Sequence, residues 1–377
     1  MGNKRRSFLK VILGGMLVFA AVPPAIYWTI DHAYAASGVA VSSVADIRGK
    51  LAPAMMKRST KVVFTYSGKV STLKSKMRDA LKQAIESDPY LNYTVENYTY
   101  TFRGTANSAT VTVMIKYRET AEQTEWVTRK SKQILAAITR PGMTSHEKVK
   151  VIHDWVVLNL KYDRTLSKYT AYEGLTTGSA VCQGYSLLTY RLLEGAGIKN
   201  LIVEGTARSG GVSQSHAWNL VQLDGRWYHL DTTWDDPTPD RAGEVSIDYY
   251  MRTDAQMRRD HSWVKSYPAA TVSYQKTLAA LAASGGAKAE AYSSLYKALR
   301  YNLLDETNIV SDGPGIRLAV EQAMGAGKSS ATIRYRGGKA KLNRDLDVLS
   351  ELGISSLDYT MAPFENTTDL TVVLNWG

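Results

Sequence analysis

The sequence is poor in the patterns that mark disulfides, metal sites and cofactor sites. Only one of its 377 residues is a cysteine, Cys182, so no disulfide can form within the chain and the thiol has another role. The six histidines include no His-x-x-x-His pair and no His/Cys cluster with zinc-ligand spacing, which argues against a metal hydrolase. No Asp-rich loop has the spacing of a calcium site. We therefore expect no metal and no cofactor.

Signals for nucleotide and nucleic-acid binding are also lacking. Residues 325–329, Gly-Ala-Gly-Lys-Ser, look like the end of a phosphate-binding loop, but Gln322 stands where the first glycine belongs and no apolar strand precedes it. Lysine and arginine are scattered along the chain instead of forming a block with interleaved aromatic residues. The sequence thus predicts no nucleic-acid partner.

Apolar and basic residues, in contrast, are plentiful. The 44% apolar and 10% aromatic content supports a substantial core, and the length predicts two or three domains. The formal charge is +11; without the first 35 residues, 42 basic residues face 34 acidic ones, a surplus of +8. This surplus favours an anionic neighbourhood such as a cell-wall polymer, a membrane surface or an acidic protein.

The first 35 residues are typical of an export signal. The basic segment 4–6 precedes an apolar run over 11–22, and Ala-Tyr-Ala at 33–35 forms a cleavage site, so we expect the mature chain to begin at Ala36. The basic segment resembles a twin-arginine signal; general secretion and an uncleaved membrane anchor are the alternatives. We expect an exported protein, extracellular, wall-bound or membrane-associated, that contacts the membrane only through this segment if it is uncleaved.

Hydrophobic periodicity predicts the same order of elements near both ends of the chain. The first β-α-β-β unit is predicted as a strand over 61–66, a helix over 73–85 and strands over 93–102 and 109–117. The second is predicted as a strand over 331–335, a helix over 342–352 and strands over 356–361 and 370–376. A diverged internal repeat explains this similarity; chance resemblance of two common units is the alternative.

These patterns divide the chain into five parts. They are an export signal over 1–35, an N-terminal unit over 36–119, a central domain over 120–267, a helical connector over 268–310 and a C-terminal unit over 311–377.

Cys182 lies at the predicted start of a helix. Small residues over 178–180 precede it, and Leu187, Leu188, Leu192 and Leu193 follow at helical spacing. In the first turn of a helix, the free N–H groups and the positive end of the dipole favour a thiolate. The alternative for a lone cysteine is a small buried apolar side chain.

A predicted β-hairpin supplies a base for this thiol. Its strands cover 215–223 and 226–234 and flank Asp224-Gly225, the dipeptide of a two-residue type I′ turn. In that turn Leu223 pairs with Arg226, which sets the register of the whole hairpin.

The register brings two carboxylates near His216. Asp231 lies opposite Trp218, on the face that His216 shares, and Asp235 lies on the other diagonal from His216. Diagonal neighbours are within side-chain reach, at about 7 to 8 Å between backbones. Geometry alone therefore leaves Asp231 and Asp235 equal as partners of His216, and His229, farther along the same face, is an alternative base.

The other histidines have no such setting. His153 falls on the apolar face of a predicted helix over 145–160, so we expect a buried, hydrogen-bonded core residue. His146 and His261 show no comparable surroundings in the sequence. The chemistry therefore depends on a Cys-His-Asp triad, in which the histidine takes the thiol proton, the carboxylate orients the histidine and the thiolate attacks a carbonyl to form a thioester. The N–H of Cys182 is the natural oxyanion donor.

Residues 169–237 resemble the bacterial transglutaminase-like domain. Three blocks match in order: Gly-x-x-Val-Cys-x-Gly-Tyr at 178–185, His-Ala-Trp-Asn-x-Val at 216–221, and Asp-Gly-x-Trp-Tyr-x-x-Asp-x-Thr-Trp-Asp-Asp-Pro at 224–237. The resemblance implies an α+β, papain-like core over about 120–267, with the cysteine on a helix packed against an antiparallel sheet that bears His216 and Asp231. It thus favours Asp231 over Asp235. Glu173 and Ser179 depart from the common pattern outside the triad.

The resemblance implies an exported thiol acyltransferase or cysteine peptidase that acts on a protein or peptide substrate. The predicted catalytic residues are Cys182, His216 and Asp231. The alternative is a non-catalytic surface module that keeps the fold while its flanking units bind an anionic cell-wall polymer or a protein. The two hypotheses differ in whether Cys182 is open to solvent or sealed beneath aromatic side chains such as Tyr185 and Trp218.

Overall fold

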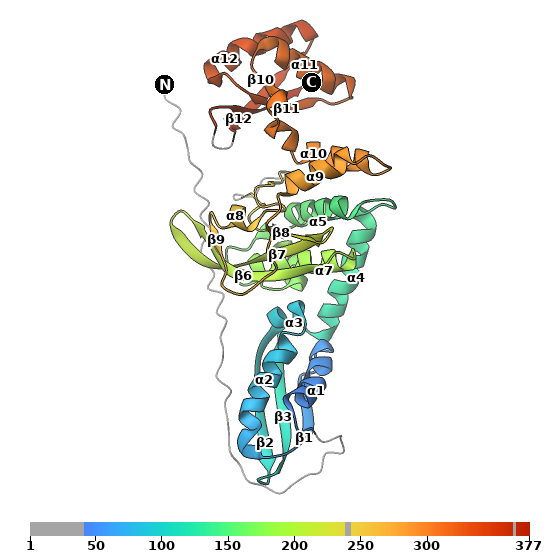
Figure 1. The fold of residues 1–377 in the computed structure, drawn as a ribbon, viewed down its shortest axis with the longest axis vertical. Helices are drawn as coiled ribbons and strands as arrows, with labels where there is room; N and C mark the ends of the chain where they lie inside the picture. Colours follow the sequence, from blue (N-terminus) through green and yellow to red (C-terminus); the bar gives the residue numbers. More distant parts are fainter. Residues whose placement is uncertain (1–40, 238–242, 365–366) are drawn as a thin grey trace. The chain divides into compact units, whose positions relative to one another are not determined.

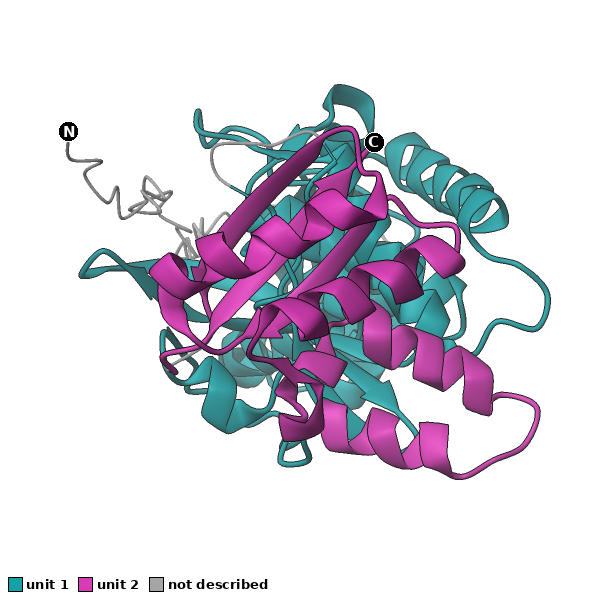
Figure 2. Cartoon of the chain, turned by 90° about the horizontal axis from the view of Figure 1, so that it is seen from above, with its two compact units in different colours: residues 1–274 teal, residues 275–377 magenta. Residues whose placement is uncertain are grey.

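The computed structural model describes residues 41–237, 243–364 and 367–377. It divides into two compact units, Met1–Tyr274 and Gln275–Gly377 (Figure 2). The predicted export signal over 1–35 lies outside the described residues. Within the described ranges, no helix has both the length and the apolar character needed to cross a bilayer. Both units combine helices with largely antiparallel sheets, so the predicted α+β class is confirmed (Figure 1).

The N-terminal part of the first unit is a three-stranded sheet with helices packed on it. Its elements are α1 (Val44–Met56), β1 (Lys61–Ser67), α2 (Leu73–Ile85), α3 (Pro89–Thr94), β2 (Val95–Gly104) and β3 (Ser108–Tyr117). The strand order is β1-β3-β2, and buried residues of α1, α2 and all three strands share one core. The strand predicted from Tyr93 begins only at Val95, because Asp88 caps a short helix that starts with Pro89.

The rest of the first unit sets helices against a four-stranded sheet (Figure 1). The helices are α4 (Ala121–Ile138), α5 (Ser145–Asn159), α6 (Ala171–Thr177), α7 (Cys182–Gly195) and α8 (Asp254–Met257), and the strands are β4 (Lys161–Tyr162), β5 (Ser179–Ala180), β6 (Asn200–Ser209), β7 (Val212–Leu223), β8 (Arg226–Leu230) and β9 (His261–Ser262). The larger sheet has the antiparallel order β8-β7-β6-β9, and α7 packs on β7. The predicted cysteine-bearing helix on an antiparallel sheet is therefore confirmed.

The sequence pattern explains why these helices begin where they do. Thr120, Thr144 and Thr170 each cap a helix, and a Gln or Glu three residues later bonds back to the cap. The hairpin follows the predicted register: Leu223 pairs with Arg226, and both turn residues between them have positive φ, as a type I′ turn requires.

The second unit repeats the β-α-β-β order. It contains α9 (Tyr274–Ala283, from the last residue of the first unit), α10 (Ala289–Ala298), β10 (Ile309–Val310), α11 (Gly313–Gly325), β11 (Ser330–Tyr335), α12 (Gly338–Asp345), β12 (Leu357–Pro363) and β13 (Leu370–Trp376). Its strand order is β10-β11-β13-β12. Residues 325–329 begin at the last residue of α11, and the negative end of a helix dipole is unsuited to phosphate.

Candidate active site

Cys182 is the first residue of α7, as predicted. The cap residue Val181 has no side chain that can bond the first-turn N–H groups, so these groups lie free beside the thiol. Gly184 is required in the same turn, because a Cβ there would lie 2.6 Å from the Cβ of Ala180. Cys182 is only 6% exposed. The thiol of Cys182 thus lies in a tightly packed helix start that is almost closed to solvent.

Side-chain hydrogen bonds hold this turn against β7. The hydroxyl of Ser186 lies 2.8 Å from the carbonyl oxygens of both Cys182 and Ala217. Asn219, also on β7, donates its amide hydrogen to the carbonyl of Ser186 at 3.1 Å. Since β7 also bears His216, these bonds fix the thiol relative to its base.

His216 bridges Cys182 and Asp231. Its Nε2 lies 2.6 Å from Asp231 Oδ2, and the imidazole also shares a hydrogen bond with the thiol of Cys182. Because Nε2 is occupied by the carboxylate, Nδ1 is the ring nitrogen left for the thiol. The indole of Trp218 stacks on the imidazole with 5.7 Å between ring centroids. The structure therefore brings the three predicted catalytic residues into one hydrogen-bonded chain.

Asp231 ends the hairpin ladder and turns the chain. Its Oδ1 accepts the backbone N–H groups of Thr233 at 3.0 Å and Trp234 at 3.1 Å. These bonds draw the chain away from β7, so β8 ends at Leu230. The predicted strand over 226–234 is therefore four residues too long. The carboxylate is fully buried and held at both oxygens, which fixes the direction in which it meets His216.

Asp235, which the hairpin geometry left equal to Asp231, has a different partner. Its Oδ2 lies 3.0 Å from Nε2 of His153, and both side chains are fully buried. Nδ1 of His153 contacts Asp154 at 2.9 Å. His153 is therefore the buried, hydrogen-bonded histidine that its helical pattern predicts, and it removes Asp235 from competition for His216.

The contacts of the three remaining histidines in the described ranges agree with the sequence-based expectation except at His261. His229, the alternative base, accepts from Trp218 at 2.9 Å and contacts Asp254 at 2.8 Å, so both its nitrogens are occupied away from the thiol. His146 contacts Asp224 and Tyr274. The expectation that His261 has no comparable setting is wrong: its Nε2 lies 3.0 Å from Asp231 Oδ2. The cause is long-range, since β9 joins the sheet beside β6.

Electrostatics favours a charged His216. Burial alone lowers the pKa of His216, but the charge of Asp231 and the hydrogen bonds to Asp231 and Cys182 outweigh burial and raise it to about 10. Burial raises the pKa of Asp231, yet the charge and hydrogen bonds of His216 and His261 hold it well below its ordinary value. At neutral pH the pair is an imidazolium facing a carboxylate, the state that stabilises a thiolate.

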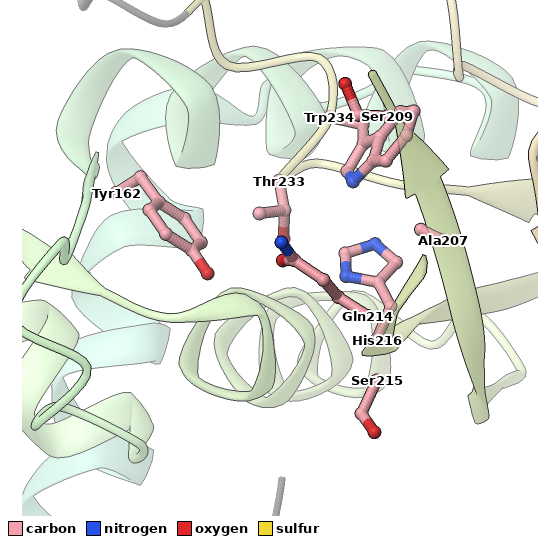
Figure 3. A pocket seen from close by; sticks show the side chains of 8 residues that line it. All are labelled: Tyr162, Ala207, Ser209, Gln214, Ser215, His216, Thr233 and Trp234. Carbon is pink, nitrogen blue, oxygen red and sulfur yellow. The ribbon is translucent and has the colours of Figure 1, made fainter. Parts of the chain in front are cut away.

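A pocket lies beside His216 (Figure 3). It holds about 350 Å³ of empty space, part of it continuous with solvent. The lining residues are Tyr162, Ala207, Ser209, Gln214, Ser215, His216, Thr233 and Trp234. Tyr162 reaches it from β4, which pairs with β5 just before Cys182. Burial and the neighbouring charges of Cys182 and Asp163 raise the pKa of Tyr162, so its hydroxyl stays protonated and available as a donor.

His216, Asp231 and His261 also lie close enough together to be tested as metal ligands. Two ligand atoms about 2.1 Å from one tetrahedral ion lie about 3.4 Å apart. The separation of 2.6 Å between His216 Nε2 and Asp231 Oδ2 is shorter and has the length of a charge-assisted hydrogen bond. The geometry thus fits shared protons, and we assign no metal to these residues.

Comparison with known proteins agrees with this arrangement. Residues 132–232 match the family model of the transglutaminase-like superfamily, and this range contains Cys182, His216 and Asp231. Residues 132–232 form a transglutaminase-like domain. The match ends one residue after Asp231, so His261 lies beyond it.

Known relatives of the transglutaminase-like domain cover only part of the chain. Kyphoscoliosis peptidase of Homo sapiens is 30% identical over 116 aligned residues, and the match covers 27% of this chain and 18% of that protein. The protein of the same name from Mus musculus is 29% identical with the same coverage. A crystal structure described as a TGase is 12% identical and covers 50% of this chain and 55% of that chain, with a TM-score of 0.26. The chain spans less than a fifth of the length of the curated relatives.

Two residues of the candidate site, Tyr162 and His261, escaped the sequence patterns. Tyr162 reaches the pocket through a two-residue strand too short to give a periodic signal. His261 also sits on a two-residue strand, between Asp260 and Ser262. The available signal was the segment Asp-His-Ser-Trp at 260–263, which resembles the closing part of the family but indicates no role for its histidine.

Proposed function

We propose that the protein is an exported thiol acyltransferase or peptidase that acts on protein or peptide amides through a thioester on Cys182. The observation that carries this proposal is the hydrogen-bonded chain from Cys182 through His216 to Asp231, beside a pocket that His216 itself lines. A buried imidazolium next to a thiol at a helix start is suited to nucleophilic attack.

The acylation step follows from the geometry. The thiol proton resides on Nδ1 of His216 while the sulfur of Cys182 attacks the amide carbonyl carbon. The backbone N–H of Cys182 stabilises the oxyanion, and the hydroxyl of Tyr162, which lines the pocket beside His216, is our candidate for the second donor. His216 then gives its proton to the leaving amine as the C–N bond breaks, which leaves a thioester on Cys182.

Deacylation reverses these roles. Water or a second amine loses a proton to Nδ1 of His216 and attacks the thioester carbon, and Cys182 leaves as a thiolate. Water completes hydrolysis, and an amine forms a new amide crosslink. Asp231 stays ionised throughout, because its low pKa keeps the negative charge that balances the imidazolium.

We also propose that the N-terminal unit docks onto an anionic cell-wall polymer. Residues 41–119 contain 13 Lys/Arg against six Asp/Glu, a surplus of +7, which is nearly the whole +8 of the chain after residue 35. Lys74, Arg78 and Lys82 are exposed and recur every fourth residue on α2, so they form one ridge about 6 Å apart. Like charges at this spacing destabilise a helix, so the ridge is better explained by binding than by folding.

A non-catalytic surface module is the second candidate. The observation that favours it is the burial of the thiol: Cys182 is 6% exposed, and the neighbouring Trp218 is 1% exposed. In such a module the triad serves only to hold α7 against the sheet.

Alkylation of Cys182 by iodoacetamide at pH 6, where a free thiol is mostly protonated, separates the two candidates. The proposed enzyme labels rapidly, and His216→Ala slows labelling by at least about tenfold because the base is lost. His146→Ala is the matched control: it removes another buried histidine, which contacts Asp224 and Tyr274, and should label like the native protein. Equally slow labelling in all three proteins would overturn the enzyme and favour the module.

A further inference from the structure

His261 reaches the site on the edge strand β9. Ala207 of β6 pairs with His261, and Thr206 pairs with Ser262. The approach is unusually close at Gly205, where a Cβ would lie 2.0 Å from the carbonyl oxygen of Ser262 and 2.7 Å from the ring of Trp218. The missing side chain at Gly205 thus allows β9 to lie where it does, and this places His261 against Asp231.

Both ring nitrogens of His261 contact carboxylates. Nε2 lies 3.0 Å from Asp231 Oδ2, and Nδ1 lies 2.6 Å from Asp260 Oδ1. Tyr249 in turn donates its hydroxyl hydrogen to Asp260 Oδ2 at 2.6 Å. His261 is fully buried at its side chain. An ionised carboxylate only accepts hydrogen bonds, so Nε2 of His261 supplies the hydrogen of its contact with Asp231.

We propose that His261 is a positioning residue of the site: by donating to Asp231 Oδ2, it fixes the carboxylate that orients His216. This inference rests on the proposed function and adds to it a residue outside the matched family range. The catalytic chain thereby extends from Cys182 through His216, Asp231 and His261 to Asp260.

Asp231 accepts four hydrogen bonds when His261 is included. Thr233 and Trp234 hold Oδ1, while His216 and His261 share Oδ2. Among the described residues, His216 and His261 are the side chains that bind Oδ2, so without His261 the carboxylate can tilt about the Oδ1 contacts. The tilt moves the imidazole of His216 relative to the sulfur, and a small misplacement of a base costs rate.

His261 also affects the charge balance of the cluster. The titratable groups that face it are Asp231, Asp260, His216, His229 and Tyr249. Burial first, and then the charge of His261 among others, lowers the pKa of His229, although Asp254 opposes this.

His153 provides a matched control. It too is fully buried between two carboxylates, Asp154 and Asp235, but it does not touch Asp231 or His216. His153→Leu and His261→Leu remove the same group from the same kind of surroundings. A merely structural histidine lowers stability in both variants, whereas a positioning residue affects the thiol only in the second.

The experiment measures Cys182 alkylation between pH 4 and 9 together with the NMR signal of the His216 ring proton that is bonded to Asp231. We expect His261→Leu to slow labelling at pH 6 by about tenfold, the effect of one hydrogen bond to a charged group, and to broaden the ring-proton signal. His261→Gln, whose amide can still donate to Asp231, should stay within about threefold of the native rate. It replaces His261→Leu if that variant does not fold.

The outcomes separate the two proposals. Native labelling and an unchanged ring-proton signal in His261→Leu would overturn the role of His261, as would equal slowing in His153→Leu. Slow labelling of the native protein that His216→Ala does not change would overturn the proposed enzyme. In that case the ring-proton signal still decides whether His261 positions the Asp231–His216 pair.

Discussion

The N-terminal and C-terminal β-α-β-β units have the same plan but use their charges differently. In both, the first strand pairs antiparallel with the third, which pairs with the second. In both units, a helix precedes the first strand, and a valine just before that helix pairs in parallel with a tyrosine at the end of the strand. The pairs are Val41 with Tyr66 and Val310 with Tyr335. These shared features are what a diverged internal repeat predicts.

The similarity extends to a set of side chains around each tyrosine. Lys76 donates to the hydroxyl of Tyr66 at 3.0 Å and to the carbonyl of Ser42 at 2.7 Å. In the C-terminal unit, Lys341 donates to Tyr335 at 3.4 Å and to the carbonyl of Ser311. A glycine two residues after each tyrosine has φ near +150° and leaves space for the ring. The interior of the two units is therefore built alike.

The charges differ between the two units. Residues 41–119 have a surplus of +7, whereas residues 311–377 have seven Lys/Arg against eight Asp/Glu. In the C-terminal unit, Arg334 and Arg336 form ion pairs with Asp369. On α2, Lys74 and Lys82 have no carboxylate within 4.0 Å among the residues described in the N-terminal unit. The same plan thus carries a nearly neutral charge in the C-terminal unit and a positive surplus in the N-terminal unit.

The largest expected effect tests whether the two interiors are equivalent. Tyr66→Ala and Tyr335→Ala each remove a fully buried ring, so each should destabilise its own unit by about 3 to 5 kcal/mol. Hydrogen exchange of peptides from β1 and β11 measures this for each unit. Tyr359→Ala, at a partly exposed position, is the control and should cost far less. If the loss of stability in one unit were less than half of the loss in the other, the two interiors would not be equivalent.

The second prediction tests the difference in surface charge. Replacement of Lys74, Arg78 and Lys82 by Glu should weaken binding to soluble polyphosphate by about 10- to 100-fold and reduce its salt dependence, because the ridge is lost. Replacement of the exposed Lys328, Lys339 and Arg344 by Glu changes the net charge equally and is the matched control.

Titration of the binding by fluorescence at several salt concentrations measures both triple variants. Equal weakening in the two would show that net charge alone acts and would remove the docking role of α2. Binding to anionic lipid vesicles but not to polyphosphate would reassign the ridge to a membrane surface.

The smallest effect concerns the internal ion pairs of the C-terminal unit. The hydrogen bond from Arg336 lowers the pKa of Asp369, with Arg334 also contributing, against the opposing effect of burial. The folded pKa is below the unfolded value of about 4, so this stabilisation is present above pH 4 and is lost as the pH falls through the folded pKa. Asp369→Asn should therefore cost about 1 to 3 kcal/mol at pH 6 and little near pH 2.

Hydrogen exchange of β11 and β13 peptides at both pH values, corrected for intrinsic rates, measures this effect. The exposed Asp347→Asn serves as the control, and we expect no change at either pH. A pH-independent loss in Asp369→Asn would mean that packing, not charge, decides the stability at this position.

Much of the fold could be predicted because short-range patterns determine it. Helical spacing located α2, α5 and α7, and the Asp224-Gly225 turn fixed the register of β7 and β8. The β-α-β-β order of both units also followed from periodicity. Each of these signals depends on residues close together in the chain, whose geometry is limited by backbone sterics.

The tertiary structure decided which residues distant in the chain contact one another. His153, on α5, occupies Asp235 and so leaves Asp231 as the partner of His216; hairpin geometry alone could not separate the two carboxylates. The pairing of β7 with β8 ends earlier than predicted, because the Asp231 carboxylate accepts the backbone N–H groups of Thr233 and Trp234.

What the sequence by itself determined was the helix that begins at Cys182, the strand of His216 and the turn that brings Asp231 back toward it. Only the tertiary structure brought His261 against Asp231, set Tyr162 in the pocket and left Cys182 nearly buried. The physical reason is range. Local periodicity specifies which residues share a face, but contacts across 30 to 80 residues depend on how whole elements pack, and two-residue strands such as β4 and β9 leave no pattern to read in advance.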